Sequence, residues 1–234
     1  MKNLKFILML LVGMLTVSMS LTSCNNDIED NSVSEADLAT LKTKMVGNYR
    51  GKTRFYYPKG YAMYGNMVYQ KYDSLETSWN VRNDGTVTTE FPIHMLDSAI
   101  YVSKDYETTD DGKKYIALQK AISNLEQTAP MKTMQVKCNL THPNAWWSGT
   151  NGVGFYVQPD AIKVNLEFNG SNHDVYFVFA TNVGLYQFAT NDILNINSMF
   201  VFQSNLYGIC IDEMSEKNLI PSIYMRNVLF TCMK

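Results

Sequence analysis

The spacing of apolar residues changes from a helical to a strand period near residue 47. Leu38, Leu41 and Met45 recur at helical spacing and predict a short helix from Glu35 to Gly47. From residue 49 to residue 57 the period is two, which is typical of a strand with one buried face. The residues expected on that buried face are Tyr49, Gly51, Thr53, Phe55 and Tyr57.

A hairpin and two helical segments follow this strand. The segments LETSWNV and TVTTEF flank RNDG, where Asp84 and Gly85 supply the positive φ that a tight turn demands. Pro92 then opens a turn of helix. A longer helix is predicted from Lys113 to Gln127, because four apolar residues form a stripe along it and a proline follows its end.

Apolar segments separated by Gly, Asn, Asp and Pro turn signals fill the chain after residue 131. They are KTMQVKCNL, GFYVQ, IKVNLEF, DVYFVFAT, GLYQFAT, SMFVFQ, LYGICI and SIYMRNVLFTCM. VYFVFA at residues 175–180 is apolar on both faces, so we expect the sheet interior to cover one face and the helix from Lys113 the other.

These patterns together predict a mainly β fold with an antiparallel sheet. We expect either a β-barrel or a two-sheet sandwich of about ten strands, with one inserted helix and a short N-terminal helix. The chain shows no linker or internal repeat after residue 33. Residues 34–234 are therefore predicted to form a single β-rich domain.

The N-terminus has the pattern of a secretion signal. Lys2 and Lys5 precede an apolar run from Phe6 to Leu21, which is short for a membrane-spanning helix. LTSC at residues 21–24 resembles the bacterial lipobox, in which the cysteine is diacylated before cleavage makes it the first residue. The alternative is an ordinary exported protein in which this cysteine occurs by chance.

The lipobox resemblance implies a signal peptide at residues 1–23 and a lipidated Cys24 that begins a polar tether to residue 33. Acyl chains such as palmitate on Cys24 hold a protein on a bilayer, because each buried CH₂ contributes about 0.8 kcal/mol. Acids in the tether resemble the signal that sends some Bacteroidales lipoproteins to the outer surface. We expect an outer-membrane location, surface-exposed or on the periplasmic face, and protease shaving of intact cells distinguishes the two.

Charge excludes one class of function. The chain has 20 basic and 22 acidic side chains, and loss of Lys2 and Lys5 with the signal peptide changes its net charge from −2 to −4. Nucleic-acid binding needs a basic patch to neutralise phosphates, and none is evident. We predict no nucleic-acid partner.

Three cysteines remain after lipidation of Cys24, namely Cys138, Cys210 and Cys232. An exported protein can form disulfides, and Cys210 with Cys232 is the candidate pair because both lie in predicted C-terminal strands. The alternative is three buried free thiols.

Two segments behind the lipobox resemble a known family. VGNYRGK at residues 46–52 and NDGTVTTEFPIHMLDSAI at residues 83–100 are similar to a family of Bacteroidales lipoproteins described only as a domain of unknown function. The resemblance covers the whole mature chain and carries no catalytic residues. The Gly-x-Tyr-x-Gly strand that begins at Gly47 also resembles the start of lipocalin-like barrels, which would imply a lumen, although the helix at residues 113–127 departs from that pattern.

The sequence contains none of the common catalytic or metal-binding motifs. His94, His142 and His173 are isolated, and neither a His-Glu-x-x-His motif nor paired Cys-x-x-Cys occurs. The acids at residues 105–112 lack the glycine and glutamate of a calcium loop. We predict no metal site and no cofactor, and an enzyme that processes glycans is the less favoured alternative.

Aromatic clusters are the candidate binding surfaces. Trp146 and Trp147 are adjacent in a loop, where at least one indole is expected to be exposed for a sugar ring or a protein partner. Tyr61 and Tyr64 belong to a segment at residues 55–72 that is rich in tyrosine and methionine. The alternatives are a tryptophan that closes one end of the domain and a long hairpin with tyrosines along its strands.

Two serines follow aspartates in short motifs. DSL at residues 73–75 and DSA at residues 97–99 resemble the Asp-Ser-aliphatic acceptor of Bacteroidales O-glycosylation, which makes Ser74 and Ser98 candidate acceptors. Mass spectrometry of the native protein tests this assignment.

We therefore expect a lipid-anchored protein of the cell envelope that binds a glycan or another envelope component without catalysis. Its partners would be the membrane, through the acyl chains on Cys24, and a glycan or a protein. The alternatives are a structural lipoprotein that holds a partner and a glycan-processing enzyme.

Replacement of either tryptophan in the loop tests the glycan prediction. Trp146→Ala and Trp147→Ala should each abolish retention on the glycan that the wild-type protein binds, because each removes a stacking surface. Affinity chromatography on immobilised glycans measures the retention. Unchanged retention in both variants would remove this loop as a glycan site.

Overall fold

The computed structural model describes residues 46–61, 67–125, 132–140, 151–180, 185–191 and 196–233, together with Ala39 and Thr43. The chain divides into two compact units, Met1–Asn31 and Ser32–Lys234, and the described residues all belong to the second. The predicted signal peptide, Cys24 and the tether lie outside the described residues. No helix among the described residues is long and apolar enough to cross a membrane.

The described part of the chain is mainly β-structure. Its strands are β1 (Gly47–Tyr61), β2 (Met67–Val81), β3 (Thr86–Phe91), β4 (Lys132–Leu140), β5 (Asn151–Pro159), β6 (Ile162–Phe168), β7 (Ser171–Phe179), β8 (Leu185–Asn191), β9 (Ile196–Ile211) and β10 (Val228–Met233). Its helices are the 3₁₀ turns η2 (Ile93–Ala99), η4 (Glu216–Asn218) and η5 (Ser222–Tyr224) and the α-helix α3 (Asp110–Ser123).

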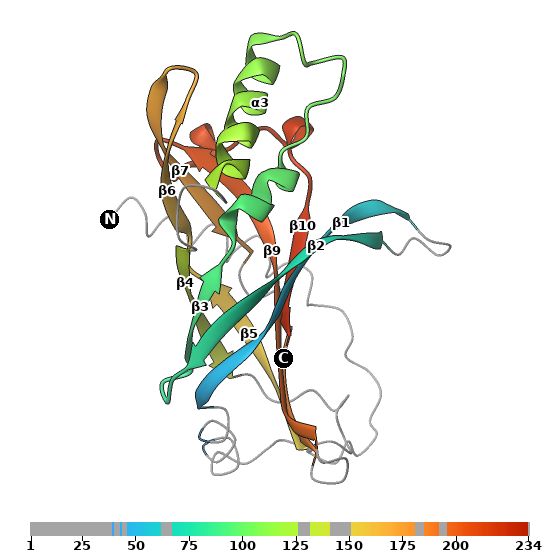
Figure 1. Cartoon of the computed structure of the whole chain (residues 1–234), viewed down its shortest axis with the longest axis vertical. Helices are drawn as coiled ribbons and strands as arrows, with labels where there is room; N and C mark the ends of the chain where they lie inside the picture. Colours follow the sequence, from blue (N-terminus) through green and yellow to red (C-terminus); the bar gives the residue numbers. More distant parts are fainter. Residues whose placement is uncertain are drawn as a thin grey trace, which may run out of the picture. The chain divides into compact units, whose positions relative to one another are not determined.

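All these strands belong to one antiparallel sheet (Figure 1). The order is β10-β1-β2-β3-β4-β5-β8-β9-β7-β6, and β9 also pairs with β10. The sheet therefore returns to its first strand, as in a barrel. The predicted mainly β, antiparallel fold is confirmed, and of the two predicted alternatives, a barrel and a two-sheet sandwich, the curled sheet resembles the barrel. The number of strands stays a prediction because only the described residues are counted.

The long strand β9 changes its neighbour on one side. Its first half pairs with β8 and its second half with β7, while β10 occupies the other side from Val201 to Leu206. The sequence predicted two strands, SMFVFQ and LYGICI, where the structure has one. The predicted strand SIYMRNVLFTCM is also wrong in its first part, because Pro221 leads into η5 and β10 begins only at Val228.

Strand β1 follows the predicted alternation only as far as Phe55. Tyr49, Thr53 and Phe55 are buried as expected. A shift of register between Phe55 and Tyr56 interrupts the period of two, and Tyr57 is half-buried instead of buried. Beyond this point β1 pairs with β2 as far as Tyr61 opposite Met67, so the tyrosine-rich segment forms the end of a long hairpin that extends away from the other strands (Figure 1).

Short-range hydrogen bonds define the β2–β3 turn and the start of helix α3. Gly85 has φ of 82°, as the predicted β2–β3 turn requires, and the Asp84 carboxylate accepts a hydrogen bond from the Thr86 amide at 2.8 Å. Helix α3 begins at Asp110, three residues before the predicted start, because the Thr109 hydroxyl caps it by accepting from the Gly112 amide at 3.0 Å.

Helix α3 packs on η2 and β6. The buried residues of β6 lie on the same face of the sheet as Val175 and Phe177 of β7, to which they are paired. The helix therefore covers the inner face, and the prediction that it covers the other face of residues 175–180 is wrong. On that other face Tyr176 and Val178 are half-buried, and Lys163 lies 5.5 Å from the centre of the Tyr176 ring.

Four phenylalanines fill the interior beside η2. The ring centres of Phe55, Phe179 and Phe230 lie 5.6, 5.5 and 4.9 Å from that of Phe91, and all three meet it edge to face. These rings come from β1, β3, β7 and β10, so one ring joins strands that are far apart in the sheet order. Edge-to-face pairs add about 0.5–1.5 kcal/mol each beyond the area they bury.

Truncation of the central ring should destabilise the whole sheet. Phe91→Ala should cost about 3–5 kcal/mol, because it leaves a cavity among three other rings. Thermal or urea unfolding of the purified protein measures this loss. The control is Ile223→Ala at a side chain that is 57% exposed, where a change within about 0.5 kcal/mol is expected. Equal effects of the two substitutions would show that the phenylalanine cluster does not hold the sheet together.

Candidate functional site

The structure locates only some of the residues predicted to bind a ligand. Trp146, Trp147 and Tyr64 lie outside the described residues, so their contacts stay predictions. Tyr61 ends β1 opposite Met67. The two predicted O-glycosylation sites lie in regular structure, Ser74 on β2 and Ser98 in η2.

Both serines are half-buried. The Ser74 amide donates a hydrogen bond to its neighbour Asp73 at 2.6 Å, and the Ser98 hydroxyl donates to the Met95 carbonyl at 3.0 Å. The Ser98 hydroxyl therefore has a protein partner. Modification of either serine stays a prediction.

The structure does not bring Cys210 and Cys232 together, and both are free thiols. Cys232 lies opposite Phe202 of β9, and Cys210 is eight residues further along the same strand. At about 3.3 Å per residue this separation is roughly 26 Å, whereas a disulfide needs Cα atoms within about 7 Å. The predicted disulfide is therefore absent, and the alternative of buried free thiols describes these two cysteines.

Cys232 belongs to a small polar cluster inside the core. The Thr53 hydroxyl oxygen lies 2.7 Å from the Thr77 hydroxyl oxygen and 3.0 Å from the Cys232 sulfur, and all three side chains are buried. Burial raises the pKa of the Cys232 thiol to about 12, although its hydrogen bond with Thr53 acts in the opposite direction. Burial also raises the pKa of Cys210. Neither thiol suits nucleophilic catalysis, which needs the thiolate.

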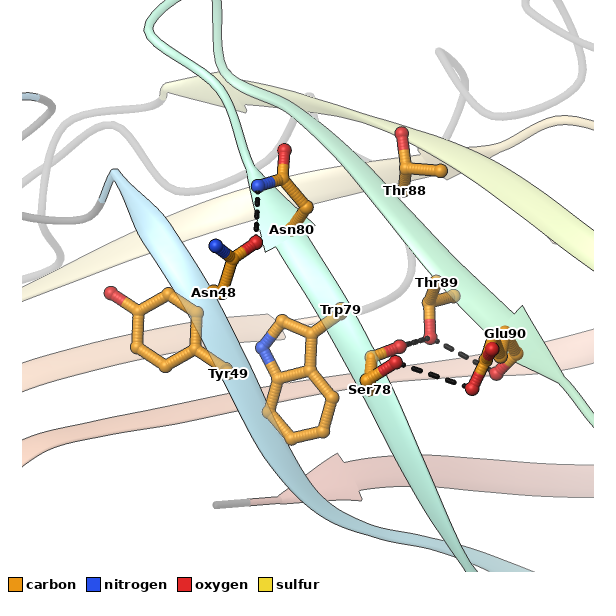
Figure 2. Close-up of a pocket in the computed structure, with 8 residues that line it drawn as sticks. All are labelled: Asn48, Tyr49, Ser78, Trp79, Asn80, Thr88, Thr89 and Glu90. Carbon is orange, nitrogen blue, oxygen red and sulfur yellow. Dashed lines mark hydrogen bonds between the residues drawn. The ribbon is translucent and has the colours of Figure 1, made fainter.

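One surface hollow among the described residues lies on β1, β2 and β3 and has a volume of about 220 Å³. We call it the asparagine hollow. Its lining residues, drawn in Figure 2, are Asn48, Tyr49, Ser78, Trp79, Asn80, Thr88, Thr89 and Glu90.

Most polar groups of the asparagine hollow bind one another. The Asn80 amide donates to the Asn48 carbonyl oxygen at 2.7 Å, and the Ser78 hydroxyl donates to the Glu90 carboxylate at 3.2 Å (Figure 2). Its stacked ring pair, Tyr49 and Trp79, has centres 6.2 Å apart, and Trp79 is only 2% exposed. These contacts hold β1 to β3 together, while the Thr88 hydroxyl is buried and has no hydrogen-bond partner among the described residues.

Another hollow lies where β9 and β10 begin to pair and has a volume of about 370 Å³. We call it the arginine hollow. Its lining residues are Ala180, Asn205, Leu206, Tyr207, Ser222, Met225, Arg226 and Asn227. The tyrosine of the arginine hollow, Tyr207, is 52% exposed, whereas the stacked rings of the asparagine hollow are buried.

The segment at residues 219–227, which supplies four of the eight residues that line the arginine hollow, lies close against β9. Leu219 lies so near Gly208 that a Cβ atom there would come within 2.4 Å of the leucine side chain. The Ile220 amide donates to the Ile209 carbonyl at 2.9 Å. Gly208 therefore allows the segment to lie flat on β9, which places Ser222 to Asn227 beside Tyr207.

Arg226 is fixed by the chain that follows η2. Its amide donates to the Ala99 carbonyl at 2.7 Å, and the Tyr101 amide donates to the Tyr224 carbonyl at 2.9 Å. This pairing places the Arg226 guanidinium 3.8 Å from the centre of the Tyr101 ring and 5.7 Å from that of Tyr57. The guanidinium is therefore held by aromatic rings in a half-buried position.

The sequence interpretation did not include Tyr207, Asn205 or Arg226 among its candidates. A signal was present in SIYMRNVLFTCM, because a charged residue and an amide interrupt an otherwise apolar run. The described residues contain no group of three His, Cys, Asp or Glu side chains arranged to hold a metal ion.

Alkylation tests the buried state of Cys232. Iodoacetamide at pH 8 should leave Cys232 unmodified in the folded protein and modify it in denaturant, because a raised pKa keeps the thiol protonated and burial excludes the reagent. Since the folded pKa is raised, the contribution of Cys232 to stability is complete below about pH 8.5 and is lost as the pH rises toward 12. Peptide mass spectrometry measures the alkylation of Cys232. For the pH dependence of the free energy of unfolding, Cys232→Ala is the control. Equal modification rates with and without denaturant would contradict this account.

Comparison with known proteins adds a family to this description. A family model described as Domain of unknown function (DUF4840) matches residues 44–210, from the start of β1 almost to the end of β9. No curated protein and no solved structure matches the chain. The resemblance to a family described as a domain of unknown function is confirmed, whereas a Bacteroidales origin, lipidation and lipocalin-like features stay predictions. Because the match spans more than half of its length, the chain belongs to the DUF4840 family.

Proposed function

We propose that this chain is a lipid-anchored protein of the cell envelope that binds a glycan without catalysis, and that the arginine hollow is its binding site. The observation that carries the proposal is the exposed Tyr207 ring in a hollow of about 370 Å³ whose lining combines the polar residues Asn205, Ser222, Arg226 and Asn227 with the apolar residues Ala180, Leu206 and Met225. An exposed aromatic ring stacks on the apolar face of a sugar, and neighbouring polar groups bind the hydroxyls.

A buried polar atom in the hollow supports this use. The side-chain oxygen of Asn205 is buried and has no hydrogen-bond partner among the described residues. A buried acceptor without a partner costs about 1–3 kcal/mol, and a ligand hydroxyl that donates to it would recover part of that cost. By contrast, Ser204 beside it donates to the Ala180 carbonyl at 3.1 Å, so the neighbouring polar side chain is satisfied within the protein.

The anchor and the location belong to the same proposal. Acyl chains on Cys24 would hold the domain at the outer membrane through the tether, and the loop with Trp146 and Trp147 would be a second glycan contact. The support for both is the sequence pattern, namely the lipobox resemblance and the adjacent indoles.

Binding of a protein partner is the second candidate function, and one observation favours it. Tyr106 and Ile223 are 43% and 57% exposed, and the Tyr106 ring meets that of Tyr224, the sequence neighbour of Ile223, at 5.9 Å. Exposed aromatic and aliphatic side chains of this kind mark protein interfaces when they are contiguous.

Replacement of Tyr207 separates the two functions. Tyr207→Ala should weaken binding of a glycan about tenfold or more, because the stacking surface is lost while the fold is unaffected. Isothermal titration calorimetry of the full chain in detergent measures the affinity for glycans first identified by a thermal-shift screen.

The matched control is Tyr106→Ala, which removes an exposed tyrosine outside the arginine hollow and should leave glycan affinity unchanged. An equal loss in both variants, or no loss in either, would place the glycan elsewhere. A loss of partner capture only in Tyr106→Ala would favour the second candidate function.

A further inference from the structure

Arg226 is a cation without a protein counter-ion in the described part of the chain. The ion pairs there are Lys52 with Glu76, Lys163 with Asp174 and His173 with Asp212, and none of them involves Arg226. No described side chain accepts a hydrogen bond from its guanidinium, whose contacts are with the rings of Tyr101 and Tyr57. A half-buried charge normally has a partner, because removal from water is costly.

The ring contacts leave the hydrogen-bonding edge of Arg226 available. A guanidinium is planar and donates within its plane, so a ring stacked on its face does not compete with those donors. The contact with Tyr101 at 3.8 Å also restricts how the side chain rotates. The arginine side chain is thus restrained by Tyr101, and Arg226 is one of the residues that line the hollow.

The arrangement of the N–H donors on the Arg226 guanidinium indicates which class of anion it would bind. Two parallel N–H groups of a guanidinium match the two oxygens of a carboxylate. The chain is acidic, with a net charge of −2, so attraction of an anion must come from the local site and not from the whole molecule. An anion that also carries a sugar ring would use Tyr207 and the unpartnered Asn205 oxygen in the same hollow.

We propose that the arginine hollow binds an acidic saccharide, with the sugar carboxylate on the Arg226 guanidinium, the ring on Tyr207 and a hydroxyl on the Asn205 side-chain oxygen. This inference rests on the proposed glycan-binding function and names the class of glycan.

The test compares acidic saccharides with neutral partners of the same ring structure. Oligosaccharides of galacturonate, glucuronate, mannuronate and guluronate, each paired with its methyl ester, are titrated into the full chain in detergent by calorimetry. At least one acid should bind tenfold or more tightly than its ester, and its affinity should fall as salt is raised. If no acid binds more tightly than its ester, the inference is overturned.

Three variants assign the preference to Arg226. Arg226→Gln should bind acid and ester with equal affinity, because the charge is lost while hydrogen-bonding capacity is kept. Arg226→Lys should keep only part of the preference, since the charge remains and the fork is lost. Tyr207→Ala should weaken acid and ester by the same factor. A full preference retained in Arg226→Gln would overturn the assignment, and the unfolding midpoint of each variant confirms that it is folded.

The design separates failure of this inference from failure of the proposed function. Neutral glycans that bind in a Tyr207-dependent manner, without any preference for acids, would uphold glycan binding and overturn the acidic class. Preference for a sulfated saccharide over every carboxylate would also overturn it. Absence of binding by all saccharides, acidic and neutral, would overturn both.

Discussion

The pairing of β9 with β10 is the constraint on which most of the described structure depends. β9 is long enough to meet β8 with its first half and β7 with its second half, while β10 lies along its other side. β10 also pairs with β1, so the strands nearest the two ends of the described chain lie side by side. Without this contact β1 and β9 would present unpaired edges, and the phenylalanines of β1, β3, β7 and β10 would have no common interior in which to meet.

The same pairing builds the arginine hollow. Leu206 faces Val228 where β9 and β10 begin to pair, and the residues that line the hollow come from β9, from the segment that leads into β10 and from Ala180, which follows β7. The backbone contact between Arg226 and Ala99 adds a further segment and brings Tyr101 to the guanidinium. The site is therefore a product of sheet closure, and the match to the DUF4840 family, which ends at residue 210, covers Ala180 and the β9 residues of the hollow but not the segment that carries Arg226.

The sequence pattern correctly predicted the elements whose limits and backbone conformation depend on residues within the element itself. β4 and β6 have the predicted limits, and the β2–β3 turn has its predicted glycine at φ of 82°. The failures have tertiary causes: the register shift after Phe55 depends on how β2 pairs, and β9 continues through a polar stretch because it has neighbours on both sides. The arginine hollow could not be predicted for the same reason, since Ala99 and Arg226 meet only in the folded chain and the sequence shows no more than a charge in an apolar run.

The polar cluster of Thr53, Thr77 and Cys232 has a consequence for how the chain selects its fold. Its three members come from β1, β2 and β10, and each needs the other strands in one alignment to find its partner. An apolar core tolerates a slip of two residues, because one aliphatic side chain replaces another, whereas a slipped pairing here would bury hydroxyl groups without partners at about 1–3 kcal/mol each. These few polar atoms therefore discriminate against misaligned sheets during folding, a selectivity that the phenylalanine cluster alone does not supply.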